Sequence, residues 1–257
     1  MTPRHLMFAA AFTLVALASP AGRALAQDDA GLRRDAAALD RQIGLLEDHV
    51  QIERIQRAYG YYVDKAQWPQ IAALFSSTGT LEIGGRGVFV GPKRVLEYLV
   101  TGLGPIGVHP RQMINHEQLQ GVVDVAPDGQ TAKGRWTAFV MSAVGGTDTR
   151  PAVAGWGDVT YENQYVKENG VWKLSRLRAP FNMYTSYKDG WGKVATPHTR
   201  PDSFAPPPDY PPTVVSLTYP SFYVEPYHYP NPVTGKPMPP PNKAAGGVAP
   251  MLPEGQP

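Results

Sequence analysis

The second half of the chain contains long segments with strand character, and the turns between them restrict what it can fold into. Alternating or β-branched residues run over Gln112–Val125, Thr131–Val144 and Asp158–Ala179. Asp128-Gly129 separates the first two segments and Asn169-Gly170 divides the third, and both dipeptides favour tight hairpin turns. The sequence therefore predicts long antiparallel strands that pair with their neighbours along the chain.

A helical pattern precedes these strands over residues 27–57. Four apolar residues repeat at intervals of 4, 3 and 4 positions and therefore share one stripe of a helix: Leu39, Ile43, Leu46 and Val50. Asp48 with Gln51 three positions later has the pattern of a capping box, so either one helix or two helices meeting near Asp48 are expected.

Two shorter helices and a glycine-rich turn follow. Pro69 and Pro92 each suit the first turn of a short helix. The glycines between residues 84 and 87 lie between apolar segments and predict a hairpin; a phosphate loop would need a following lysine and hydroxyl, which are missing. Helices first and long strands afterwards predict an α+β fold, with helices packed on one face of a curved antiparallel sheet.

Both ends of the chain differ in composition from this domain. Residues 1–26 combine Arg4 and His5, an apolar run to Ala18 and small residues before Gln27, which is the order of a secretory signal peptide. The apolar run is too short to span a bilayer comfortably. We therefore expect export to the periplasm or the medium, an N-terminal helix over 27–49, a main domain over 50–195 and a tail over 196–257.

The tail holds two thirds of the chain's 27 prolines, which excludes regular helix or central strand. It also carries seven aromatic residues: Phe204, Tyr210, Tyr219, Phe222, Tyr223, Tyr227 and Tyr229. Composition alone leaves a flexible linker and a docked segment equally open. Because burying an aromatic side chain is worth about 1.5–3 kcal/mol, we predict that residues 204–229 pack on a folded domain.

Composition excludes several classes of function. The chain has no cysteine, so it forms no disulfide, thiolate metal site or cysteine nucleophile. Without Arg4 and Arg23 the 22 remaining basic residues match the 22 acidic ones, so nucleic acid is not an expected partner. No HExxH, GxSxG or dinucleotide-binding pattern occurs, and we expect no metal, no cofactor and no membrane span.

Polar residues on otherwise apolar elements mark a candidate site. His116 shares a strand face with Ile114, Gln118 and Gln120, a mixture that suits a pocket wall better than a solid core. Taken alone, His116 indicates a structural histidine and Asp64 a helix end or N-cap. If the two meet, the carboxylate would orient the imidazole and raise its basicity.

The strand after residue 158 supplies further candidates. Tyr161, Asn163 and Tyr165 share one of its faces, while Trp136 lies on the opposite strand face from Arg135. The tyrosines fit two interpretations: amphipathic core residues whose hydroxyls find a partner, or phenols that hold a substrate hydroxyl at a pocket wall.

The elements follow one another in the order of a helix, the segment DKAQWPQIAALF, a hairpin, a helix, His116 on a strand and the closing GVWKLSRL. In this order of elements the chain resembles a SnoaL-like domain of the nuclear transport factor 2-like superfamily over about residues 50–187. Within the superfamily it is most similar to the scytalone dehydratase and SnoaL-like branch, and it also resembles bacterial γ-formaldehyde lyases that act on lignin-derived diaryl compounds. The resemblance implies a cone-shaped fold enclosing an apolar pocket. Asp64 and His116 match the dehydratase's catalytic aspartate and first histidine, whereas Ser142 and Tyr161 stand where it has a second histidine and an asparagine.

The resemblance implies a cofactor-independent lyase that uses general acid–base chemistry on a small aromatic substrate, releasing formaldehyde to give a stilbene. His116 would be the main base or acid, Asp64 its orienting partner, and Tyr161 and Tyr62 phenolic donors. The expected substrate-binding residues are Tyr59, Gln118, Trp136, Asn163 and Arg135. A homo-oligomer is expected. A related isomerase, cyclase or dehydratase, and an exported binding protein without catalysis, remain open alternatives.

Overall fold

The computed structural model describes residues 20–191, 206–214, 218 and 223–239. The chain divides into two compact units, residues 1–44 and 45–257, and only the first part of helix α1 (Pro20–Asp64) belongs to the former. The expected signal peptide lies largely outside the described residues. None of the helices in the described part of the chain combines the length and apolarity needed to cross a membrane.

Helix α1 settles whether one helix or two precede the sheet, because it runs unbroken through Asp48. Asp48 is therefore not an N-cap. It is buried, and its carboxylate accepts hydrogen bonds from Lys167 Nζ at 2.8 Å and from Trp172 Nε1 at 2.7 Å. Further along the same side of α1, Ile52 and Tyr59 are buried in the core.

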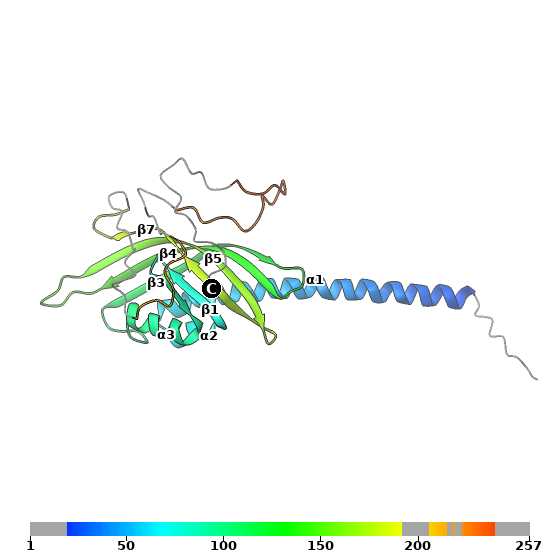
Figure 1. Ribbon diagram of the computed structural model, residues 1–257, viewed down its shortest axis with the longest axis horizontal. Coiled ribbons are helices and arrows are strands. Elements are labelled where there is room, and N and C mark those ends of the chain that lie inside the picture. Colours follow the sequence, from blue (N-terminus) through cyan, green and yellow to red (C-terminus); the bar gives the residue numbers. More distant parts are fainter. Residues whose placement is uncertain (1–19, 192–205, 215–217, 219–222, 240–257) are drawn as a thin grey trace, which may run out of the picture. The chain divides into compact units, whose positions relative to one another are not determined.

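Helices α2 (Trp68–Ala73) and α3 (Gly91–Gly102) each carry a proline in their first turn, as predicted. Between them, β1 (Phe75–Ile83) and β2 (Val88–Val90) pair as the expected antiparallel hairpin. The glycines of its turn have positive φ angles, which explains why glycine occupies them. Figure 1 shows α2 and α3 side by side against the sheet.

The remaining strands follow in chain order: β3 (Gln112–Val125), β4 (Thr131–Val144), β5 (Val153–Glu168), β6 (Val171–Ala179) and β7 (Phe181–Ser186). The sheet has the order β2-β1-β6-β5-β4-β3, and β7 pairs with β5. The predicted antiparallel pairs β3–β4, β4–β5 and β5–β6 are confirmed. One pair departs from the expectation: β1 joins β6 in parallel, so the sheet is mixed.

The core lies between the helices and one face of this curved sheet (Figure 1), which confirms the predicted α+β class. Leu81, Leu174 and Leu177 from β1 and β6 are fully buried there. On β5, Tyr161 and Tyr165 face the same core, as strand alternation requires. The predicted face assignment of these tyrosines is therefore correct.

Two stretches of the described tail, 213–214 and 223–228, pack on the opposite face of the sheet, whereas residues 231–237 are exposed. Glu225 forms an ion pair with Arg178 of β6 in which both side chains are almost fully buried. Thr213 N–H donates to the carboxylate of Glu82 on β1 at 2.7 Å, and Tyr223 is buried. The docking predicted from the aromatic content is thus seen for this part of the tail, while Phe204, Tyr219 and Phe222 lie outside the described residues.

Candidate active site

A cavity of about 320 Å³ lies between the end of α1 and the inner face of the sheet. Its lining is mainly apolar and aromatic, and several of its side chains are almost completely buried, including Tyr59, Trp68, Val159 and Tyr161. The Trp68 indole donates to the Gly104 carbonyl at 2.8 Å, which fixes one wall. A concave, apolar space with a few convergent polar groups is the usual form of a small-molecule site.

His116 and Tyr161 bring their polar atoms together inside this cavity. His116 extends from β3 and Tyr161 from β5, and the imidazole Nε2 contacts the phenol oxygen in a short hydrogen bond. The sequence placed both residues on inward strand faces but gave no sign that they would be partners. Their contact arises because β4 lies between their strands and both side chains point to the same side.

Burial sets the charge state of this pair. It lowers the pKa of His116 from 6.5 to about 4, so the imidazole is neutral at neutral pH. Burial and the neighbouring Tyr59 hydroxyl raise the pKa of Tyr161 well above 10, and the Gln118 side chain opposes this rise. The pair therefore consists of an uncharged base and an uncharged hydroxyl donor.

Tyr59 completes this group from the helix side. Its ring packs edge-on against His116 and Tyr161, with centroid distances of 5.9 Å to each. Burial raises its pKa above the ordinary tyrosine value, although a hydrogen bond to Tyr161 acts in the opposite direction. Tyr59 was expected to bind substrate. Its position beside Tyr161 also makes its hydroxyl a second neutral proton donor.

Asp64 meets His116 through the backbone. Its Oδ1 accepts a hydrogen bond from the His116 backbone N–H at 2.6 Å, whereas the prediction had the carboxylate orienting the imidazole ring. Gly60 permits this approach, because a Cβ there would lie 2.9 Å from the His116 carbonyl oxygen. Asp64 lines a more open cleft of about 510 Å³ on the other side of His116, together with Gln118 and Tyr61. It positions strand β3 at the histidine, and burial raises its own pKa.

Three of the expected substrate-binding residues belong to a buried polar network behind the cavity. Asn163 Nδ2 donates to Gln56 Oε1 at 2.8 Å, and Gln56 Nε2 donates to Gln118 Oε1 at 2.7 Å. Trp136 Nε1 donates to the Tyr165 hydroxyl at 3.1 Å. Gln118, Trp136 and Asn163 are not among the described residues that line the 320 Å³ cavity; they support its wall instead.

Two other expected site residues lie away from the cavity. Arg135 points to the outer face of the sheet, where it pairs with Glu162 at 2.8 Å and donates to the Pro226 carbonyl of the tail at 2.9 Å. Strand alternation explains this, since its neighbour Trp136 faces inward. Tyr62 is half-buried against the core and is not one of the described cavity residues.

The structure adds cavity residues that were not among the expected site residues. Arg86, from the β1–β2 turn, lines the cavity and donates to the Tyr98 hydroxyl at 2.9 Å. Ser142 and Tyr184 line it together, with their hydroxyls 3.2 Å apart. Tyr184 lies on β7, a strand that was not predicted, although the alternating FNMYTS segment carried the signal for it.

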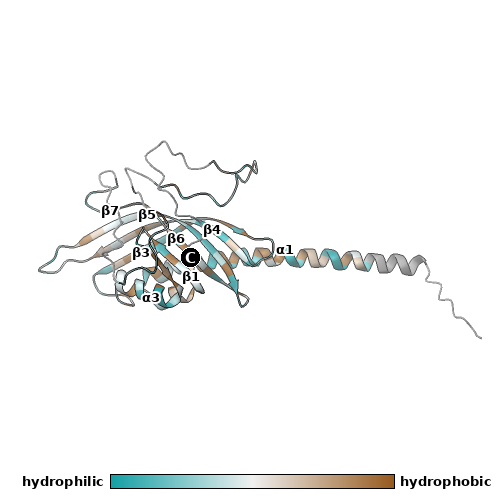
Figure 2. Ribbon diagram, in the orientation of Figure 1, coloured by the Kyte–Doolittle hydropathy of each residue, from teal (hydrophilic) through white to brown (hydrophobic). Residues whose placement is uncertain are grey.

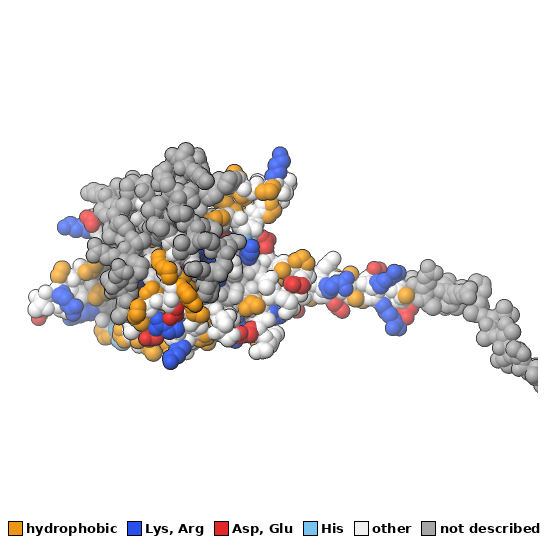
Figure 3. All heavy atoms as spheres, in the orientation of Figure 1, with side chains coloured by type: hydrophobic (Ala, Val, Ile, Leu, Met, Phe, Trp, Pro, Cys, Tyr) orange, Lys and Arg blue, Asp and Glu red, His pale blue; other side chains and the backbone are white. Residues whose placement is uncertain are grey.

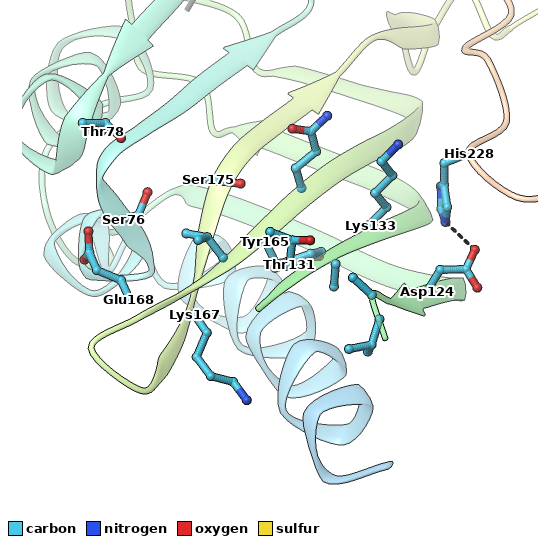
Figure 4. A pocket seen from close by; sticks show the side chains of 15 residues that line it. Ser76, Thr78, Asp124, Thr131, Lys133, Tyr165, Lys167, Glu168, Ser175 and His228 are labelled. Carbon is cyan, nitrogen blue, oxygen red and sulfur yellow. Dashed lines mark ion pairs between the residues drawn. The ribbon is translucent and has the colours of Figure 1, made fainter. Parts of the chain in front are cut away.

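A larger groove of about 740 Å³ lies on the outer face of the sheet (Figure 4). Its charged side chains are largely paired with one another or with close neighbours: Lys167 with Asp48, Glu168 with Lys173, and His228 with Asp124. Such pairing leaves few groups directed at a ligand. The smaller, apolar cavity with His116 and Tyr161 is therefore the better candidate for chemistry.

Metal binding finds no support in the described part of the chain, where no three His, Asp or Glu side chains gather as ligands would. His116 contacts a phenol and a backbone-bound carboxylate rather than further imidazoles.

Comparison with known proteins gives one relative by sequence and several solved structures of similar fold. The chain aligns with hexachlorocyclohexane dehydrochlorinase 1 of Sphingobium indicum at 24% identity over 131 residues, 48% of this chain and 74% of that protein. Among solved structures, a hexachlorocyclohexane dehydrochlorinase from Novosphingobium barchaimii matches with a TM-score of 0.47 and 19% identity, over 60% of this chain and 99% of that one. An NTF2-like protein with a cystatin-like fold from Novosphingobium aromaticivorans matches with a TM-score of 0.44 and 18% identity, over 56% and 87%.

A family model adds the assignment itself. The model described as SnoaL-like domain matches residues 45–178, which is more than half of the chain and includes His116, Tyr161 and the whole of the strand-rich region up to Arg178. On this match, and as the sequence resemblance predicted, the chain belongs to the SnoaL-like domain family.

Proposed function

We propose that this protein is a cofactor-independent lyase that eliminates a group from a small, largely aromatic substrate by general acid–base chemistry. The observation that carries the proposal is the uncharged His116–Tyr161 pair enclosed in an apolar cavity. An elimination needs one group that accepts a proton and another that donates one to the leaving group. This pair supplies both without any bound metal or organic cofactor.

The roles follow from the charge states. A neutral imidazole accepts a proton, so His116 is the base, and its lowered pKa keeps it available across the neutral pH range. Tyr161 and Tyr59 stay protonated because burial raises their pKa values, so they act as donors. Each positioned proton transfer contributes on the order of 100- to 10,000-fold to the rate.

The lining indicates the substrate class. Trp68, Phe181 and Tyr184 present aromatic surface to the cavity, and its volume of about 320 Å³ suits a small ligand. Arg86 supplies a cationic group at one side of an otherwise neutral space. A flat aromatic compound with a hydroxyl or other polar leaving group fits both features.

A lignin-derived diaryl propanediol is the specific substrate we propose. His116 takes the proton of the γ-hydroxyl, the Cβ–Cγ bond breaks and formaldehyde leaves. The electron pair of that bond forms the Cα=Cβ double bond, while the α-hydroxyl departs as water with a proton from a tyrosine. The products are formaldehyde, water and a stilbene, and the proton passes from histidine back to tyrosine to restore the site.

The name of one relative is consistent with an elimination reaction. Its name, dehydrochlorinase, describes loss of hydrogen chloride, which also requires removal of a proton and departure of a leaving group. A dehydratase or isomerase would use the same base and donors. For this reason the test has to identify products rather than measure substrate consumption alone.

The experiment incubates the purified protein with a panel of lignin-derived dimers and measures formaldehyde and stilbene together. We expect both in equal amounts from one diaryl propanediol. His116→Gln and Tyr161→Phe should each lower kcat/KM at least 100-fold. Tyr165→Phe is the matched control, because Tyr165 is equally buried on the same face of β5 but lies outside the cavity lining.

The outcomes separate the alternatives. Alkene without formaldehyde would indicate a dehydratase, and an isomeric product would indicate an isomerase. Tight binding without turnover, unchanged by His116→Gln, would overturn the catalytic proposal in favour of a binding protein. Equal losses for Tyr161→Phe and Tyr165→Phe would show that the tyrosine effect is structural.

A further inference from the structure

Helix α1 exposes an apolar stripe that the fold leaves uncovered. Five large side chains of the stripe are between 45% and 69% exposed: Leu32, Leu39, Ile43, Leu46 and Val50. Figures 2 and 3 show hydrophobic residues interspersed with charged ones along this helix. Single exposed leucines are ordinary, but five on one helix stripe require an explanation.

The stripe has a heptad repeat. Leu32, Leu39 and Leu46 are seven residues apart, and so are Ala36, Ile43 and Val50. The first set precedes the second by four residues, which assigns leucine to the d positions and Ala, Ile and Val to the a positions. β-Branched residues at a with leucine at d are the combination that favours two-stranded coiled coils.

At Val50 the stripe faces away from the protein's own core. Val50 is 53% exposed, whereas Ile52, two positions later, is fully buried. Two positions correspond to about 200° around an α-helix. Asp48, two positions before Val50, is likewise buried by Trp172 and Lys167. At Val50 the core side and the stripe are therefore opposite sides of the helix.

We propose that this stripe, residues 32–50 of α1, pairs with the same helix of a second copy of the chain as a two-stranded coiled coil. The repeat is bounded at both ends by charged residues in heptad positions, Asp29 at a before it and Glu53 at d after it. It covers about three heptads, close to the shortest length that supports a coiled coil. The dimer should therefore depend on protein concentration.

The charges of the helix favour a second copy over a membrane surface. Helices that lie on membranes usually carry Lys and Arg on the polar side. Here three arginines between residues 33 and 41 are balanced by Asp35, Asp40 and Glu47, so the polar side has no net basic character. Interspersed charges of both signs are typical of the flanks of a coiled coil.

The test is the oligomeric state of the purified chain, measured by sedimentation equilibrium from about 1 to 200 μM. We expect a monomer–dimer equilibrium. The double variant Leu39→Lys with Leu46→Lys should weaken dimerisation at least 100-fold, because it would place charges in the seam. The control adds the same charges outside the stripe, as Ala37→Lys with Gln51→Lys, and should dimerise like the unchanged protein.

Circular dichroism and the melting temperature at low concentration show whether each variant keeps its fold, since lysine is a good helix former. A monomer over the whole concentration range would overturn the proposal. So would a dimer that survives in the stripe variant, because another surface would then hold it. Co-sedimentation of a monomer with anionic phospholipid vesicles, lost in the stripe variant, would assign the stripe to a membrane instead.

Discussion

Asp48 offers a sharp test of how α1 is held to the sheet. Replacing it with alanine removes the acceptor of the Trp172 indole N–H, whose side chain is almost fully buried, and the counter-charge of Lys167. Loss of one partner of a buried charge pair costs about 3–5 kcal/mol. Lys167 is 22% exposed and can reach water, and alanine favours the helix by about 0.6 kcal/mol, so we expect a net loss of about 2–3 kcal/mol.

The measurement is the free energy of unfolding from urea titrations, supported by thermal melting. For a domain of this size the loss corresponds to a fall in Tm of roughly 4–12 °C. Asp48→Asn keeps an acceptor oxygen for Trp172 and should lose only about half as much. Asp148→Ala, which removes an exposed carboxylate from the β4–β5 loop, should stay within about 0.5 kcal/mol. If Asp48→Ala matched that control, the contacts of Asp48 would not be what fastens the helix.

Three further predictions follow from the other buried groups. The kcat/KM of a substrate identified as above should be flat above about pH 5 and fall below about pH 4, the pKa of His116. The imidazole of the unfolded chain takes up its proton from about pH 6.5 downward, so the free energy of unfolding should fall by up to about 1.4 kcal/mol per pH unit between about pH 6.5 and pH 4. His116→Gln should remove this part of the pH dependence. Glu225→Gln leaves Arg178 buried without its counter-charge and should lower the free energy of unfolding in urea titrations by about 3 kcal/mol. Asp209→Asn, in a more exposed pair with Arg94, should lower it by less than about 1 kcal/mol. Removing all residues after Thr196 should lower the Tm. Activity should persist after exhaustive chelation; loss that a single metal ion restores would show that the histidines were misinterpreted.

Local patterns in the sequence were enough to predict most of the fold. Asn169-Gly170 specified the β5–β6 hairpin because both residues adopt positive φ there, which few other pairs do readily. Pro92 likewise located the start of α3. The parallel pairing of β1 with β6 could not be read in this way, since it joins segments almost a hundred residues apart and depends on how the sheet closes around the helices.

The sequence predicted which strand face each site residue occupies, but not which residues contact one another in the site. Alternation placed Tyr161 inward and Arg135 on the face opposite Trp136, and both assignments agree with the structure. The alternation of side chains along a strand shows which face a residue occupies, but not whether that residue lies at the cavity or beyond it. Trp136 and Asn163 share the inner face with Tyr161 yet lie in the supporting network rather than at the cavity. Partners such as His116 and Tyr161 depend on the register of three strands, which no local pattern contains.

The two faces of β5 differ in charge around Tyr161. Tyr161 and Asn163 point inward without charge, while Glu162 between them points outward to Arg135 and His228. Arg86, the cationic residue among the described residues that line the cavity, donates to the Tyr98 hydroxyl. Burial, rather than a charged neighbour, lowers the pKa of His116. The ion pairs under the tail and the base in the cavity are therefore separable, so tail variants should alter stability while leaving the acid limb of the pH profile in place.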